Sequence, residues 1–175
     1  MKHRMLPFTL TAAVVVADQI SKALIVNNIP EGTVAARFFN DFLWICHVRN
    51  DAVAFSMGSG LPELVKIIVF IILPLIIIAL LSYAVFTGKA DRSELTEGER
   101  WCLAGIAGGG IGNLIDRIFR GMRVVDWIST DNYGWFGMER FPTYNIADAA
   151  VVVSVIILVL LVIISSIRRK DVKKD

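Results

Sequence analysis

The sequence is poor in the residues that mark disulfide frameworks and metal sites. Its only two cysteines, Cys46 and Cys102, lie in different segments, so their spacing indicates neither a disulfide framework nor a metal site. Cys46 precedes His47, but adjacent residues rarely form a nucleophile–base pair, and a lone buried cysteine usually contributes packing. No HExxH or GxSxG motif is present. The residues therefore indicate neither a zinc protease nor a thiol or serine hydrolase.

The chain also lacks a large excess of charge of one sign. Eighteen Lys and Arg residues are balanced by 16 Asp and Glu residues, for a net charge of +2. This balance gives no indication of a nucleic-acid partner, and none is expected. The basic residues of the C-terminal tail instead suit the anionic surface of a membrane, so membrane lipids are expected partners.

Long apolar stretches are what the chain has in abundance. Hydrophobic residues make up 55% of it, and the mean hydropathy is +0.63. Four stretches are long enough to cross a bilayer as helices, which takes roughly 20 apolar residues each. We therefore predict an all-α membrane protein that forms a single integral-membrane domain over residues 1–175, with helices at about 6–26, 64–86, 101–119 and 145–167.

The distribution of Lys and Arg predicts how these helices are oriented. The two termini and the 88–100 loop carry ten of these residues, whereas the loops at about 27–61 and 120–143 carry five. Both termini are therefore predicted to be cytoplasmic. The first stretch resembles a signal peptide, but Asp18, Gln19 and Lys22 interrupt it and no clear cleavage site follows, so we expect a retained helix.

The two loops on the other side have the composition of ordered structure. Residues 33–56 are rich in β-branched and aromatic residues, which predicts a small β-rich element at the outer membrane face. Aromatic rings concentrate at the headgroup level of membranes. Two roles stay open for the rings of these loops: anchoring alone, or anchoring together with gripping a substrate. The rings are those of Phe38, Phe39, Phe42, Trp44, Trp127, Tyr133, Trp135, Phe136 and Phe141.

Ionisable side chains inside a membrane segment are costly, roughly 2.5–3.5 kcal/mol each at its centre, and therefore indicate function. Asp18 and Lys22 are four residues apart and share one face of the first helix. We interpret them as an ion pair that fixes helix packing rather than as catalytic groups.

The third stretch combines small and polar residues. Glycines at small-residue spacing permit close approach of a neighbouring helix: Gly105, Gly109 and Gly112. Asn113 and Arg117 are four apart and share a face, while Asp116 has two candidate partners, Arg117 and Arg120. Arginines reaching from a helix end to the interface explain Arg120, but Asn113 lies too deep in apolar sequence for this explanation.

Two aspartates reach the same depth on the predicted outer side. Asp126 follows the outward-running third helix, and Asp148 lies about one turn inside the fourth. Short connections favour adjacent helices, so both carboxylates are expected to face a common cleft. Two close carboxyl groups share one proton and titrate as a unit.

This pair predicts aspartic hydrolysis of a peptide bond. The ionised aspartate takes a proton from water, and the protonated one polarises the carbonyl and later protonates the leaving amine. The chemistry requires no metal ion, and no cofactor is expected. Proton or ion translocation is the alternative, but the polar residues cluster towards one face. A structural subunit would leave the placement of Asp126 beside Asp148 unexplained.

Five blocks resemble prolipoprotein signal peptidase (signal peptidase II), a family of bacterial membrane aspartyl proteases. They are “ADQISK”, “RNDAVAFS”, “GGGIGNLIDR”, “VVDWIS” and “YNIADAAV”, and their order and spacing agree over nearly the whole chain. The resemblance implies a catalytic dyad of Asp126 and Asp148. It also implies supporting residues that orient the dyad or the substrate: Asp18, Lys22, Asn50, Asn113, Arg117 and Asn145.

The resemblance further implies a substrate and a location. The substrate would be a bacterial lipoprotein precursor with a diacylglyceryl-modified cysteine, cleaved just before that cysteine at the outer face of the inner membrane. A cyclic lipopeptide, globomycin, would inhibit the enzyme in the same cleft. One departure is visible: Ala52 stands where the family's outer-loop motif has glycine, which adopts backbone angles closed to alanine. The resemblance therefore carries over the chemistry but not the conformation of this loop.

Overall fold

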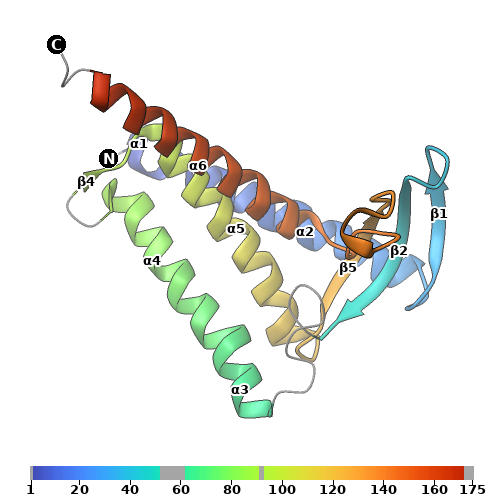
Figure 1. Ribbon diagram of the computed structural model, residues 1–175. Coiled ribbons are helices and arrows are strands. Elements are labelled where there is room, and N and C mark those ends of the chain that lie inside the picture. The colour runs from blue at the N-terminus through green and yellow to red at the C-terminus, as the bar shows by residue number, and fades with distance from the viewer. Residues whose placement is uncertain (1, 52–61, 91–92, 172–175) are drawn as a thin grey trace.

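The computed structural model describes residues 2–51, 62–90 and 93–171. The outer-loop segment that contains Ala52 lies outside the described residues, as do Arg92, Lys173 and Lys174 of the predicted basic side. Helices form a bundle, and a small antiparallel sheet stands at one end of it (Figure 1). The helical elements are α1 (Lys2–Met5), α2 (Phe8–Asn28), α3 (Glu63–Ile67), the π-helical turn η2 (Ile68–Ile72), α4 (Leu73–Thr87), α5 (Glu97–Phe119), the 3-10 turn η3 (Trp135–Gly137) and α6 (Ile146–Asp171).

Among the described residues, three helical stretches are long and apolar enough to cross a membrane: Phe8–Asn28, Glu63–Thr87 and Ile146–Ile167. They confirm the first, second and fourth predicted helices as membrane-capable. Large apolar side chains cover their outer faces, and Leu80 and Val153 are both more than half exposed. An apolar surface of this extent is suited to lipid rather than to water.

Helix α5 has 23 residues but is less apolar than the others, and its role as a fourth span stays a prediction. It lies in the middle of the bundle and contacts α2, α4 and α6 (Figure 1). Small and polar side chains suit a helix that is surrounded by protein. Its start at Glu97 precedes the predicted start at 101, because Thr96 and Glu99 form a capping box there.

The glycines of α5 allow its neighbours to approach closely, as their spacing predicts. A Cβ atom on Gly109 would lie 2.3 Å from the backbone oxygen of Ala147 in α6. One on Gly112 would lie 2.7 Å from Oδ2 of Asp18 in α2. Since no Cβ fits at either distance, these glycines set the separation of α5 from both neighbours.

Replacing Gly109 with alanine is expected to destabilise the bundle by about 1–3 kcal/mol, the range found for overpacked sites. The new methyl group would meet backbone atoms, which cannot rotate away. Gly110→Ala is the matched control, because its Cβ would meet only the Ile78 side chain, at 3.1 Å. Thermal unfolding in detergent measures the difference, and equal melting temperatures for the two variants would contradict this account of the packing.

A π-helical turn shapes the second membrane-capable helix. Residues Ile68–Ile72 form this turn directly before Pro74, which lies in the first turn of α4. Proline has no N–H, and its ring crowds the carbonyl four residues earlier, here that of Phe70. The wider π turn accommodates this crowding. Phe70 and Pro74 both line the cavity described below.

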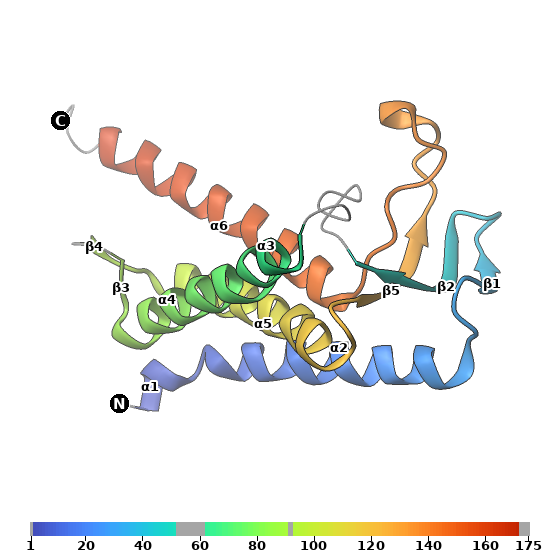
Figure 2. The ribbon, with the colours of Figure 1, turned by 90° about the horizontal axis from the view of Figure 1, so that it is seen from below.

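The sheet has the strand order β1-β2-β5, and both pairs are antiparallel. Its strands are β1 (Val34–Phe38), β2 (Leu43–Asn50) and β5 (Val124–Thr130), which confirms strands within 33–56. Val48 lies opposite Asp126 in the register. Figure 2 shows the sheet at the end of the bundle opposite the N-terminus. A second hairpin, β3 (Lys89–Ala90) with β4 (Ser93–Glu94), joins α4 to α5.

Exposed aromatic rings extend from the sheet, as predicted for the outer loops. The β1–β2 turn holds Phe39, Asn40 and Asp41 in the left-handed region, and the Phe39 side chain is 77% exposed. The 131–141 loop exposes Trp135 and is fastened to this turn through Arg140. The Arg140 guanidinium donates to the backbone oxygen of Asp41 at 2.9 Å. The choice between membrane anchoring and substrate contact for these rings stays open.

Candidate active site

Asp126 is a buried carboxyl group in the middle of β5. Its side chain is only 3% exposed, although an ionisable group in a strand more often faces solvent. Asn145 donates to its Oδ1 at 2.7 Å, and Asn50, at the end of β2, donates to its Oδ2 at 3.2 Å. The pairing of β2 with β5 brings Asn50 to this place, although it is 76 residues away in sequence.

Asp148 lies in the first turn of α6 and is half-buried. Its backbone N–H donates to Oδ1 of Asn145 at 3.0 Å, and its Oδ2 accepts the backbone N–H of Asn145 at 3.1 Å. This reciprocal pair is a capping box built from asparagine and aspartate. Oδ1 of Asp148 accepts a further hydrogen bond, from Nδ2 of Asn113 at 2.7 Å. The helix start therefore fixes the orientation of the Asp148 carboxyl group.

Asn145 connects the two aspartates. Its side-chain amide donates to Asp126, while its backbone N–H donates to Asp148. The residue is fully buried, so its amide has no competing bonds with bulk water. The predicted dyad is thus held together by one asparagine, whose position is set by the first turn of α6 and the neighbouring strand β5.

Lys22 determines which way the amide of Asn113 faces. The Lys22 ammonium donates to Oδ1 of Asn113 at 2.9 Å, and Nδ2 of Asn145 donates to the same oxygen at 3.1 Å. With two donors on its oxygen, Asn113 must turn its NH₂ group towards Asp148. Lys22 therefore acts on the dyad through Asn113.

A buried charge cluster lies beneath these residues. Lys22 pairs with Asp18 at 2.8 Å and with Asp116 at 3.1 Å, and all three side chains are 0% exposed. This confirms the predicted Asp18–Lys22 pair. Of the two candidate partners of Asp116, the structure pairs it with Arg120, in addition to Lys22. Three ammonium protons thus meet three oxygen acceptors, the two carboxylates and Asn113.

The cluster also binds the backbone that carries the dyad. Oδ1 of Asp18 accepts the N–H of Ala147 at 3.1 Å, and Oδ2 of Asp116 accepts the N–H of Val125 at 3.0 Å. These amides directly precede the two aspartates of the dyad in sequence. Gln19, for which no role was predicted, reinforces the cluster by donating to Asp116 at 3.1 Å. Its place beside Asp18 in an otherwise apolar stretch, within the block “ADQISK”, was the sequence signal for this role.

A cavity of about 560 Å³ opens over the two aspartates. Asn50, Asn113 and Arg117 also line it, so the structure brings the predicted polar residues to one place, with Asp18, Lys22 and Asn145 behind its wall. Arg117 lies 5.6 Å from the ring of Phe70 and interacts electrostatically with both aspartates of the dyad. The remaining lining is mostly apolar: Val69, Phe70, Pro74, Gly109, Gly110, Val124, Phe141, Pro142, Thr143, Tyr144, Val151 and Val152.

The environment of Asp126 favours its protonated form. Burial and the neighbouring carboxylate of Asp148 raise the pKa of Asp126 to about 7, against the opposing effect of the bonds from Asn50 and Asn145. Near neutral pH Asp126 can therefore still offer a carboxylic acid beside the carboxyl group of Asp148. Among the described residues, no cluster of three His, Cys, Asp or Glu side chains is arranged to hold a metal ion.

The chain matches one protein family over most of its length. Residues 10–164 match the family described as “Signal peptidase (SPase) II”. The chain is 40% identical to the lipoprotein signal peptidase of Treponema denticola over 172 residues, which cover 98% of this chain and 96% of that protein. It is 40% identical to the lipoprotein signal peptidase of Treponema pallidum over 151 residues, 86% of this chain and 79% of the relative.

The fold is also similar to solved structures. One is described as “Bacterial membrane enzyme structure by the in meso method at 2.3 A resolution”, with a TM-score of 0.76 at 26% identity. The likeness covers 92% of this chain and 89% of that one. A second, described in the same words at 1.9 A resolution, has a TM-score of 0.72 at 27% identity and covers 90% and 92%.

Proposed function

The chain belongs to the signal peptidase II family of lipoprotein signal peptidases, and we propose that Asp126 and Asp148 are its catalytic dyad. The protein is then an aspartic endopeptidase of the bacterial inner membrane. Its substrate is a lipoprotein precursor with a diacylglyceryl-modified cysteine, and it hydrolyses the peptide bond just before that cysteine.

One observation carries the proposal: two carboxyl groups from distant elements line one cavity and are held there by a shared asparagine. A purely structural ion-pair network would place each carboxylate against a cation. Within the described residues, the hydrogen-bond donors to Asp126 are instead the neutral amides of Asn50 and Asn145. Amide donors orient a carboxyl group and leave it free to exchange a proton.

The surroundings divide the catalytic roles between the two aspartates. Burial keeps a proton on Asp126, so Asp126 donates a hydrogen bond to the scissile carbonyl and later protonates the leaving amine. Asp148 lies at the start of α6, where backbone N–H groups and the helix dipole favour negative charge. It is the base that takes a proton from the attacking water.

The membrane explains the apolar part of the cavity. We propose that the cavity lies at the outer face and both termini at the cytoplasmic face, with α5 as the fourth span of one integral-membrane domain. The cysteine's lipid chains then remain in the bilayer while its peptide bond reaches the dyad. The family's cyclic lipopeptide inhibitor, globomycin, would occupy the same cavity. Arg117 lies where it can bind a backbone carbonyl of either ligand.

The proposal predicts that cleavage declines above about pH 7. Below this pH Asp126 keeps the proton that the proposed acid needs. Above it Asp126 is ionised, and no acid is left to polarise the carbonyl. The value of kcat/KM should therefore fall tenfold for each pH unit above the transition, with one proton involved. A flat profile from pH 6 to pH 9 would exclude Asp126 as the acid.

The bond that is cut identifies the reaction. Purified protein is incubated with a lipid-modified precursor, and the products are analysed by mass spectrometry. We expect a signal peptide ending in a new carboxylate and a mature chain beginning with the lipidated cysteine. Their masses should sum to that of the precursor plus one water. Cleavage at any other bond would contradict the proposed function.

A further inference from the structure

A second cavity lies at the other end of the molecule and takes no part in the chemistry described above. Its volume is about 610 Å³. Residues of the N-terminal turn, of the last two turns of α4 and of β3 surround it: Arg4, Leu80, Tyr83, Ala84, Thr87, Lys89 and Ala90. Pro74 of the catalytic cavity and Thr87 are separated by about 20 Å of helix, given 1.5 Å per residue.

The buried side chain of Arg100 holds these segments together. Its guanidinium donates to the backbone oxygens of Arg4 at 2.7 Å and Val85 at 3.0 Å, and to Oε2 of Glu97 at 2.9 Å. An arginine that is 93% buried ordinarily serves a defined geometry, because desolvating it is costly. Here it ties α1 to α4 and α5, so the walls of the cavity are fixed before any ligand binds.

Two cations from distant parts of the sequence meet at this cavity. Arg4 comes from α1 and Lys89 from β3, and both side chains are exposed. Within the described part of the chain, no ion pair joins either cation to an acidic side chain. Glu97 is paired with Arg100, and Glu94, opposite Lys89 in the hairpin register, is not within ion-pair distance of it. The described residues therefore leave the positive charge of Arg4 and Lys89 at this cavity without an acidic partner.

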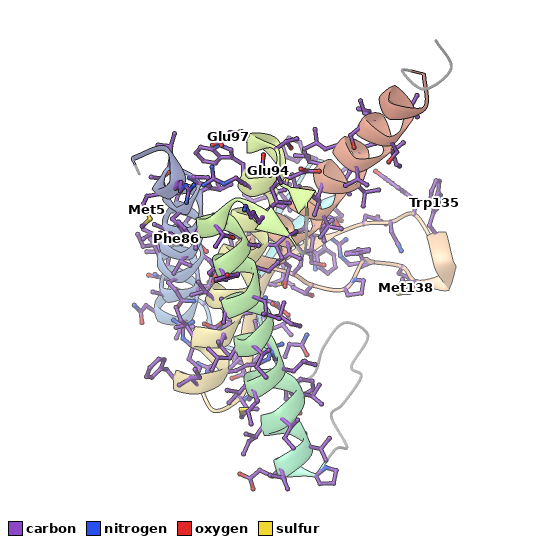
Figure 3. All side chains as sticks on the ribbon, turned by 90° about the vertical axis from the view of Figure 1, so that its left-hand side faces the viewer. Met5, Phe86, Glu94, Glu97, Trp135 and Met138 are labelled. Carbon is purple, nitrogen blue, oxygen red and sulfur yellow. The ribbon has the colours of Figure 1, made fainter. Side chains whose placement is uncertain are left out.

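The rest of the cavity suits an amphiphile. Tyr83 is 67% exposed and carries a hydroxyl group, while Leu80 and Ala84 supply an apolar wall along α4. Met5 on α1 and Phe86 on α4 are half exposed at the same end of the molecule (Figure 3). Since α4 ends a membrane-capable helix at Thr87, the cations lie at its polar end and the apolar wall faces the bilayer.

We propose that this cavity binds one anionic phospholipid, on the membrane face opposite the catalytic cavity. Arg4 and Lys89 bind the headgroup phosphate, which both residue types recognise well. The acyl chains lie along the exposed apolar side of α4. Basic pockets of this kind between membrane helices select anionic headgroups. The bound lipid connects α1 to α4, which the Arg100 side chain also connects through its hydrogen bonds.

The test compares phosphatidylglycerol with phosphatidylcholine. Full-length protein is delipidated in detergent and titrated with each lipid, and bound lipid is counted by native mass spectrometry. We expect one tightly bound phosphatidylglycerol per chain and a higher melting temperature. In the Arg4→Gln/Lys89→Gln variant its affinity should fall about 10- to 30-fold, as expected for the loss of two basic residues near an anionic headgroup. Arg4 bonds to Arg100 through its backbone oxygen, so this substitution leaves that bond in place.

Matched controls separate a built site from general attraction. The Arg168→Gln/Arg169→Gln variant removes the same charge from α6 at the same end of the bundle and should bind phosphatidylglycerol as the parent does. Equal weakening in both variants, or no weakening in either, would overturn the proposal. Displacement of the lipid by glycerol phosphate would assign the site to a soluble anion and also overturn it. If both variants still cleave the precursor, they are folded. If the parent itself cleaves no precursor, only the proposed dyad is refuted, and the lipid measurements still decide the lipid site.

Discussion

Replacing either Asp126 or Asp148 with asparagine should lower the rate of precursor cleavage by about 10³-fold or more, the scale of a lost catalytic acid or base. Each asparagine keeps one oxygen that can accept the bond from Asn145, so the folded site should survive. The two residues act as one catalytic unit, so the double variant should be hardly slower than either single variant. Initial rates from a gel-shift assay measure all three.

Stability distinguishes a lost catalytic group from a misfolded protein. Because the folded pKa of Asp126 is raised, the parent loses stability as pH rises from about 4 to about 7 and then stays level. The Asp126→Asn variant has no such loss, so its melting temperature should gain on that of the parent over this range. Asp131→Asn, five residues along and outside the cavity, is the matched control and should cleave normally. Near-parental activity from Asp126→Asn or Asp148→Asn would refute the dyad.

Replacing Lys22 with methionine should cost about 3–5 kcal/mol of stability, the usual cost of leaving a buried charge without its partner. The cluster would retain two carboxylates, Asp18 and Asp116, against the single cation Arg120. Asn113 would lose one of the two donors on its side-chain oxygen, which would weaken the hold of its amide on Asp148. Both the melting temperature and kcat should fall sharply.

A second substitution tests whether charge is the cause. Adding Asp18→Asn to Lys22→Met leaves Asp116 balanced by Arg120, and an asparagine oxygen can still accept the N–H of Ala147. The double variant should therefore be more stable than Lys22→Met alone, a coupling that double-mutant cycles resolve. Additive losses would show that Lys22 contributes only packing at this place.

Much of the fold could be predicted because the bilayer allows few structures. Long apolar stretches predicted four membrane helices, of which three are membrane-capable in the described part of the chain, and β-branched and aromatic residues predicted the strands of the outer loop. The predicted span that composition describes least well is α5. Its contacts are with other helices, so glycines such as Gly109 replace the large apolar side chains that lipid-facing helices carry.

The site was predictable in its residues but not in its connections. Ionisable groups are costly to place beside membrane segments, and their common depth indicated Asp126 and Asp148. The i, i+4 spacing indicated the Asp18–Lys22 pair. The strand that carries Asp126 was predicted only as loop, because its partner β2 is distant in sequence. The role of Asn145 depends on a capping box and on a contact with β5, and no local sequence pattern reports such a contact.

The same limit explains why the cavity at the other end was not visible in the sequence. Arg4 and Lys89 are far apart in sequence, with α2, two strands and α4 between them. Taken individually, each is predicted only to be a basic residue of the cytoplasmic side. The bonds of Arg100 to α1 and α4 hold them at one cavity. Long-range side-chain contacts are thus the part of both sites that the structure adds.

Lipid-dependent cleavage is the most direct test of the central claim. Purified protein is given the same lipoprotein precursor in two forms, with and without the diacylglyceryl group on its cysteine, alongside the Asp126→Asn variant. We predict that the parent shortens only the modified precursor and that the variant shortens neither. If the parent cleaves neither form, while proteoliposomes containing it conduct protons, the dyad is part of a translocation path and the proposed peptidase function is wrong.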